Sequence, residues 1–257
     1  MSQQWYNQFL RELAQVQAYK KRMFDLLKVQ EGQLVLDVGC GDGADTLRLA
    51  RLVGGSGSAV GIDTSMDAIV EAFRRSEGIG LPVEFWVMDA HRLILIKDAY
   101  FHRCFCDRVL QHLQDPLQAL TAMFRVLKPG GIAVCHEPDW GLLSIQGASR
   151  ELTVRIIDYL TRNMIRNGTI GTQLSTLLFQ AGFEGLQVHK QEGEFVDVEE
   201  ALKILRADAV LERMWAAGAI SQYEQAGWLE QLRESDQKRD FRMVMSSFIA
   251  RARKPVV

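Results

Sequence analysis

Short apolar runs alternate with amphipathic segments along the first 140 residues of the chain. Apolar runs rich in β-branched and aromatic residues predict strands, whereas apolar residues at every third or fourth position predict helices. The five expected strands cover residues 34–38, 59–62, 83–88, 101–106 and 132–135. Because helical segments separate these runs, the pattern predicts an α/β fold with a doubly wound, mostly parallel sheet.

The remainder of the chain, residues 141–257, predicts two further strands and additional helices. The sixth strand is expected at residues 185–191 and the seventh at residues 241–252, which completes a seven-stranded sheet. Residues 196–240 between them have helical periodicity. We expect this segment to be a helical insertion that acts as a substrate cap.

The N-terminal segment, residues 1–30, is expected to form a helical lid ahead of the first strand. Apolar residues recur at helical spacing over residues 5–27, with polar residues between them. Residues 20–22 form a short basic cluster within this helix, and we expect the cluster to be a solvated face. Residues 31–140 are then the expected cofactor-binding core.

The first predicted strand runs into a glycine-rich turn and then into a helix. Asp37 near the strand end is followed by glycines at 39, 41 and 43. Glycine permits a positive φ and lets a ligand approach the backbone, and a helix N-terminus offers free N–H donors. Two cofactor classes fit this turn. Gly39, Gly41 and Ala44 match the spacing of dinucleotide-binding turns, whereas an acid followed by three alternating glycines suits S-adenosylmethionine (SAM).

Carboxylates stand at or near the end of each of the first five predicted strands. They are Asp37, Asp63, Asp89, Asp107 and Glu137. Ligands of parallel sheets bind at the carboxyl ends of the strands, so these acids are expected to lie at one edge. A carboxylate after the second strand can accept hydrogen bonds from both ribose hydroxyls, which is the role we expect of Asp63.

Composition narrows the set of partners. The chain has 257 residues and a formal net charge of -2, so no strongly basic face indicates a nucleic-acid partner. No run approaches the ~20 apolar residues of a membrane span, and the N-terminus has no signal-peptide pattern. We therefore expect a soluble, cytoplasmic protein without a membrane span; the sequence does not indicate an oligomeric state.

The four cysteines are expected to be free thiols and not metal ligands. They are Cys40, Cys104, Cys106 and Cys135, and each lies in or beside an apolar run. A single C-x-C pair without a second ligand pair is poor support for zinc. We expect buried thiols in a reducing compartment and no metal.

Five blocks of the sequence, taken together, resemble the class I SAM-dependent methyltransferases. They cover residues 35–43, 61–65, 88–90, 109–113 and 126–131, the last reading Val-Leu-Lys-Pro-Gly-Gly. The resemblance extends over about residues 30–140 and is greatest to the small-molecule branch, which includes ubiquinone, menaquinone and secondary-metabolite enzymes. It implies a Rossmann-like fold, SAM as the cofactor, and a transferase activity of the EC 2.1.1 type.

The resemblance also implies a role for individual residues. Asp37 and the loop of Gly39, Cys40 and Gly41 should hold the methionine part of SAM. Asp63 should hold the ribose, and Thr64, Asp89 and Ala90 should hold the adenine. Asp107, or its neighbour Cys106, should line the pocket near the sulfonium.

The acceptor and the base are the least determined parts of the site. A hydroxyl acceptor needs a group that removes its proton, and Glu137, Asp139 and His112, together with His136, are the candidates. An amine or carbon acceptor needs no strong base. Apolar and aromatic residues of the expected cap favour a small apolar or aromatic acceptor. A methyltransferase acting on protein or RNA, a nicotinamide-dependent oxidoreductase and a non-catalytic SAM-binding protein are the alternatives.

Overall fold

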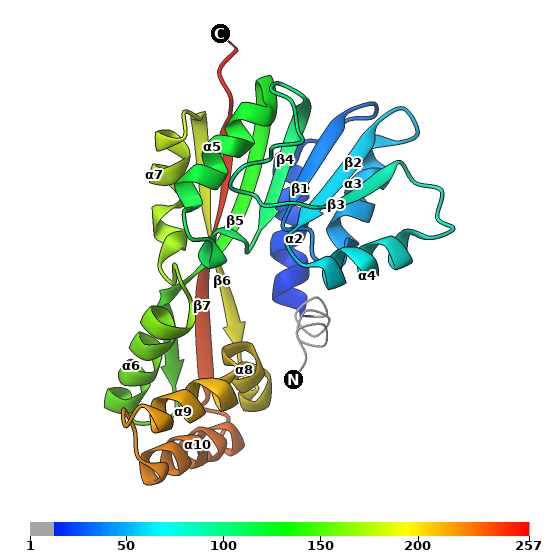
Figure 1. Ribbon diagram of the computed structural model, residues 1–257. Helices are drawn as coiled ribbons and strands as arrows, with labels where there is room; N and C mark the ends of the chain where they lie inside the picture. The colour runs from blue at the N-terminus through cyan, green and yellow to red at the C-terminus, as the bar shows by residue number, and fades with distance from the viewer. Residues whose placement is uncertain (1–12, 257) are drawn as a thin grey trace. The chain divides into compact units, whose positions relative to one another are not determined.

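The computed structural model describes residues 13–256, and within them the strands form one seven-stranded sheet in the order β3-β2-β1-β4-β5-β7-β6 (Figure 1). The strands are β1 (Leu34–Val38), β2 (Ser58–Asp63), β3 (Val83–Val87), β4 (Phe101–Asp107), β5 (Leu127–Gln146), β6 (Glu184–Phe195) and β7 (Arg242–Arg253). Strands β1 to β5 pair in parallel. The predicted α/β doubly wound, mostly parallel sheet is confirmed.

The chain divides into two compact units. Within the described residues, the core unit contains Lys20–Glu137, Gln173–His189 and residues 248–256. The second unit contains residues 13–19, Pro138–Thr172 and Lys190–Ser247. The long strands β5, β6 and β7 each contribute residues to both units. The predicted N-terminal lid includes residues 1–12, which lie outside the described residues.

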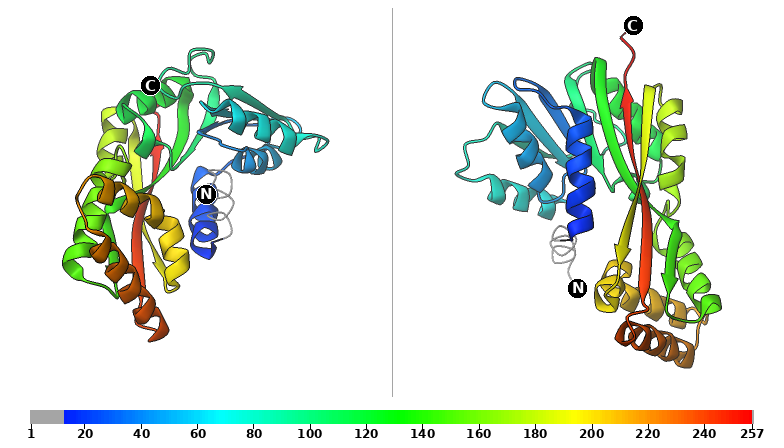
Figure 2. Two further views of the ribbon diagram at one scale, coloured as in Figure 1. Left: turned by 60° about the horizontal axis from the view of Figure 1, so that its bottom comes forward. Right: turned by 180° about the vertical axis from the view of Figure 1, so that it is seen from behind.

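Helices of the core unit cover both faces of its sheet. They include α3 (Ala44–Val53), α4 (Met66–Ser76), α5 (Pro116–Val126), the short 3-10 helix η1 (Leu110–His112), and the larger parts of α2 (Ala14–Leu27) and α7 (Ile170–Gln180). The Phe24 ring of α2 packs 5.2 Å from Phe105 of β4, and α5 lies on the opposite face (Figures 1 and 2). Ser65 and Asp115 cap α4 and α5, because their side chains accept hydrogen bonds from the N–H groups of the first helical turn.

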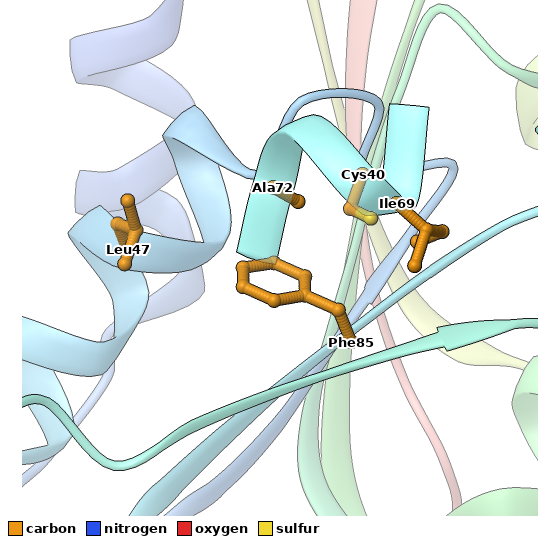
Figure 3. Packing of buried hydrophobic residues seen from close by; sticks show 5 residues of the cluster. All are labelled: Cys40, Leu47, Ile69, Ala72 and Phe85. Carbon is orange, nitrogen blue, oxygen red and sulfur yellow. The ribbon is translucent and has the colours of Figure 1, made fainter. Parts of the chain in front are cut away.

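A compact apolar cluster supports the glycine turn from below. Cys40, Leu47, Ile69, Ala72 and Phe85 pack together between the turn, α3, α4 and β3 (Figure 3). Gly43 has φ +77°, and a Cβ there would lie 2.7 Å from the Phe85 ring and 2.8 Å from the Ala72 Cβ. Only glycine therefore fits at position 43, and this packing fixes the position of the turn.

The second unit contains the predicted helical insertion. Between β6 and β7 the chain forms α8 (Val198–Leu205), α9 (Ala207–Ala216) and α10 (Gln222–Gln237), and α6 (Arg150–Tyr159) precedes them, followed by a π-helical turn at Leu160–Met164. Among the described residues 13–256, every helix is too short or too polar to cross a bilayer.

The prediction that the fifth strand ends at residue 135 was wrong. Strand β5 continues to Gln146 through Glu137, Pro138 and Asp139, which local sequence rules assign to a strand end. Both acids are buried within the strand and accept hydrogen bonds from distant segments. Tertiary contacts therefore extend the strand past the point where its local pattern breaks.

We expect Thr153→Val to lower the free energy of unfolding by about 1–3 kcal/mol, because it leaves a buried donor unsatisfied. The Trp228 Nε1–H donates to the Thr153 hydroxyl at 2.9 Å, and both residues are buried in the second unit. Urea denaturation measures the change. Thr121→Val, at an exposed hydroxyl on α5, is the matched control and should shift stability by less than about 0.5 kcal/mol. Equal midpoints for the two variants would contradict the expectation.

Candidate active site

The glycine turn is anchored at its start and open at its centre. The N–H groups of Gly39 and Cys40 donate to the Ile62 carbonyl of β2 at 2.8 and 2.9 Å. A Cβ at Gly39 would lie 2.3 Å from a methyl carbon of Val109. The loop that joins β4 to η1 therefore packs directly on the glycine turn. Gly41, in contrast, has φ +54° and no atom within 4 Å of a Cβ placed on it. The turn therefore has room for a ligand at Gly41.

Asp63, the last residue of β2, lies beside this opening. Its Oδ2 accepts from the Gly41 N–H at 3.0 Å, and its Oδ1 accepts from the Ser65 N–H at 2.9 Å. Asp63 is half-buried, and the neighbouring Thr64 is exposed. Both carboxylate oxygens are thus oriented by backbone donors at the carboxyl end of the sheet.

Asp37 is buried beneath the turn. The Thr46 hydroxyl of α3 donates to its Oδ2 at 2.6 Å. Burial, helped by the nearby Asp45 carboxylate, raises the pKa of Asp37 to about 7. Cys40 is buried as well, and burial raises the pKa of its thiol well above the usual range. These two predicted cofactor residues therefore support the turn from inside.

Asp89 and Ala90 follow β3 at the same edge. The Asp89 Oδ1 accepts from the His91 N–H at 2.9 Å and lies 2.6 Å from the His91 Nδ1. These contacts lower the pKa of Asp89, and the hydrogen bond from the His91 N–H has the largest effect. The Asp89 side chain is half exposed. The Asp115 N–H donates to the His91 Nε2 at 3.2 Å, so His91 connects the β3 end with the start of α5.

Asp107 at the end of β4 lies in a buried charged group. Its Oδ2 is 2.5 Å from the Lys20 Nζ and 3.6 Å from the Arg108 Nε, and its Oδ1 is 2.7 Å from the His136 Nδ1. Burial alone would raise its pKa, but Lys20, Arg108 and His136 together hold the pKa of Asp107 well below the usual range. Cys106, the alternative pocket residue, is fully buried.

The prediction of a solvated basic cluster was wrong for Lys20. Lys20 is buried, and its ammonium pairs with Asp45 and Asp107. One signal in the sequence could have identified it, because Lys20 falls on the same face of α2 as the buried residues Val16, Met23 and Leu27.

Glu137 and Asp139, two of the predicted base candidates, have separate partners. Glu137 is fully buried, and its Oε1 accepts from the N–H groups of Val109 and Leu110 at 2.8 and 2.6 Å. Burial raises the pKa of Glu137 to about 8. Asp139 belongs to the second unit, where its Oδ2 accepts from the Thr172 N–H at 2.9 Å and hydroxyl at 2.8 Å. His112, the third candidate, is exposed on η1.

Comparisons with known proteins identify the family of this chain. Residues 30–208 match the family described as "Methyltransferase domain". An uncharacterised 37.1 kDa protein in transposon TN4556 of Streptomyces fradiae is 38% identical over 227 residues, which are 87% of this chain and 65% of that protein. The demethylmenaquinone methyltransferase of Staphylococcus carnosus is 32% identical over 123 residues, 48% of this chain and 50% of that enzyme. The chain thus spans about half to two thirds of the length of these relatives.

Among solved structures, the YcgJ protein of Bacillus subtilis superposes with a TM-score of 0.64, at 15% identity, covering 93% of this chain and 99% of that chain. At this identity the likeness concerns the fold alone. The family match covers more than half of the residues and includes the glycine turn and the ends of β1 to β5. The chain therefore belongs to the methyltransferase-domain family, as its five sequence blocks indicated.

Proposed function

We propose that the protein is a SAM-dependent methyltransferase that acts on a small, apolar or aromatic molecule. The observation that carries the proposal is the placement of Asp63. Its carboxylate is held by the N–H groups of Gly41 and Ser65 beside the open centre of the glycine turn. A carboxylate in this position suits the two adjacent hydroxyls of a ribose.

The residues present fit an adenosyl cofactor. Asp63 would hold the ribose, Thr64, Asp89 and the Ala90 N–H would hold the adenine, and Asp107 would face the sulfur. The half-exposed Asp89 side chain and the open space at Gly41 support this assignment, because both leave polar groups and room at the carboxyl edge of the sheet. Asp37 and Cys40 would act from beneath by holding the turn in its binding conformation.

SAM supplies an activated methyl group on a cationic sulfur, and the protein supplies position and electrostatics. The residues of this chain would bind the cofactor and would hold its sulfur near the carboxyl ends of β1 and β4. Alignment of the acceptor with the methyl group can contribute several kcal/mol to the barrier reduction. The acids near this edge favour a cationic ligand over a neutral one.

We propose that the methyl acceptor is a small molecule. This proposal is supported by the relative named demethylmenaquinone methyltransferase and by the formal net charge of -2, which does not indicate the excess of basic residues typical of RNA-binding proteins. A protein or RNA acceptor is the alternative. The match to the methyltransferase-domain family disfavours the other alternative, a nicotinamide-dependent oxidoreductase that would bind its dinucleotide at the glycine turn.

The roles predicted for Glu137, Asp139 and His112 as bases stay predictions. Because the Glu137 carboxylate accepts from the backbone of η1, we favour a positioning role for it over proton abstraction. The lid at residues 1–30, the cap at residues 196–240 and the cytoplasmic location also stay predictions.

Calorimetric titration of the purified chain with SAM, S-adenosylhomocysteine (SAH) and NADH tests the cofactor. We expect binding of SAM and SAH and no heat from NADH. Binding of NADH alone would overturn the proposal in favour of hydride transfer. A screen of quinols, phenols and amines with tritiated SAM then tests the acceptor, with bulk RNA and protein extract as the competing substrates.

A further inference from the structure

Two neighbouring lysines of α2 have opposite surroundings. The side chain of Lys21 is 73% exposed and pairs with Asp25 one helical turn away. The side chain of Lys20 is only 7% exposed, and its ammonium contacts Asp45 and Asp107. The same ammonium lies 5.7 Å from the centre of the Phe105 ring. Lys20 is therefore a cation enclosed by residues of the core unit.

A buried ammonium is stable only where carboxylates compensate its loss of hydration. The compensating groups here belong to the proposed cofactor site. Asp45 lies in the first turn of α3, directly after the glycine turn, and Asp107 ends β4. Asp37, beneath the turn, is close enough for its ionisation to be influenced by Lys20, Asp45 and Asp107. Three carboxylates, the Lys20 ammonium and the Arg108 guanidinium beside Asp107 thus set the local charge.

We propose that Lys20 is a specificity-determining residue that limits the preference of the cofactor site for SAM over SAH. The inference rests on the proposed function. SAM and SAH share the ribose, the adenine and the amino-acid group, and they differ by one methyl group and one positive charge on sulfur. Only fixed charges near the sulfur distinguish the two ligands electrostatically. Asp45 and Asp107 favour SAM, and Lys20 opposes them.

This arrangement has a consequence for the product complex. Methyl transfer removes the positive charge from sulfur while the ligand is still bound. With Lys20 in place, the carboxylates of Asp45 and Asp107 keep a cation after that charge is lost. Without Lys20, Asp107 would keep Arg108 and His136 as partners, but Asp45 and Asp107 would both lose the Lys20 ammonium. The sulfonium of SAM would offset that loss, and the neutral sulfur of SAH would not.

The test is the ratio of the dissociation constants of SAH and SAM, measured by calorimetry at pH 8 and low salt. We expect Lys20→Met to raise this ratio about tenfold, as removal of one charge near the sulfur in a partly buried site predicts. Lys20→Arg should keep the ratio within about twofold of the parent. Lys21→Met is the matched control and should not change it.

A second variant covers the case in which Lys20→Met fails to fold. Asp45→Asn removes a carboxylate that is less buried than Lys20 and should lower the ratio several-fold, opposite in direction to Lys20→Met. An unchanged ratio in either variant, or an equal loss of SAM and SAH affinity, would overturn the proposal. If the parent binds neither ligand, the proposed function itself fails, whereas tight binding of both with an insensitive ratio removes only the role of Lys20.

Discussion

Glu137→Ala is expected to lower the free energy of unfolding by about 3–5 kcal/mol, because it removes the acceptor of several buried N–H groups at once. The Glu137 carboxylate accepts from the backbone of Val109, Leu110 and, at 3.4 Å, Gln111. These residues form the entry to η1, and Val109 packs on Gly39. Loss of the carboxylate should therefore loosen both the η1 loop and the glycine turn.

Guanidinium denaturation of the parent and the variant measures this change. Glu84→Ala, at an exposed position of β3 in the same unit, is the matched control and should shift stability by less than about 1 kcal/mol. If Glu137→Ala lowers the free energy of unfolding no more than the control does, the N–H groups around η1 form other hydrogen bonds in the variant. Glu137 would then not be required to hold the loop between β4 and η1.

Glu137→Gln separates the charge of this residue from its shape. Burial raises the pKa of Glu137 from 4.5 to about 8, so the folded protein holds a proton that the unfolded chain releases between these values. The stability that this proton contributes is fully present below pH 4.5 and is lost as pH rises through about 8. Glutamine resembles the protonated carboxyl at every pH. The parent should therefore lose stability relative to the Gln variant from pH 6 to pH 8, by up to about 1.4 kcal/mol per pH unit.

A difference that stays constant between pH 6 and pH 8 would mean that Glu137 is ionised in the folded protein throughout. Asp37, whose pKa burial raises to about 7, changes stability in the same direction and is present in both proteins, so it cancels in the comparison. The measured quantity is the difference between the free energies of unfolding of the parent and the Gln variant at each pH.

Features set by neighbouring residues could be predicted from the sequence. Ser65 and Asp115 are helix caps because a short polar side chain before a helix accepts from its first turn. The acids at positions 63, 89 and 107 lie at the carboxyl edge because each ends a short apolar strand or follows it within two residues. In each case the determining residues lie within about four positions along the chain.

Features set by distant partners could not be predicted in the same way. Glu137 binds backbone donors about 28 positions earlier in the chain, and Asp139 binds Thr172, 33 positions later. No local rule distinguishes such acids from free bases at a strand end. Lys20 is an intermediate case, because its place on the apolar face of α2 is visible in the sequence, whereas its partners Asp45 and Asp107 are not.

Asp63→Asn is expected to weaken the binding of SAM about 100-fold, because it removes the charge and one of the two acceptors offered to the ribose. The amide nitrogen would also face the N–H of Gly41 or Ser65, which disturbs the side-chain orientation. SAH should lose affinity by the same factor, since its ribose is identical. This parallel loss differs from Lys20→Met, which should change the ratio of the two ligands.

Asp67→Asn is the matched control, because Asp67 is exposed in the first turn of α4, four residues after Asp63. It should bind SAM as the parent does. Calorimetry gives the affinities, and the denaturation midpoint shows whether each variant is folded at the temperature of the titration. If folded Asp63→Asn binds SAM as tightly as the parent, the ribose lies elsewhere. The binding roles proposed for the other residues at the carboxyl ends of the strands would then be wrong as well. If both ligands weaken together while the fold is retained, Asp63 defines the ribose position, and the Lys20→Met ratio then tests whether the sulfur lies near Asp107 at the end of β4 and Lys20 of α2.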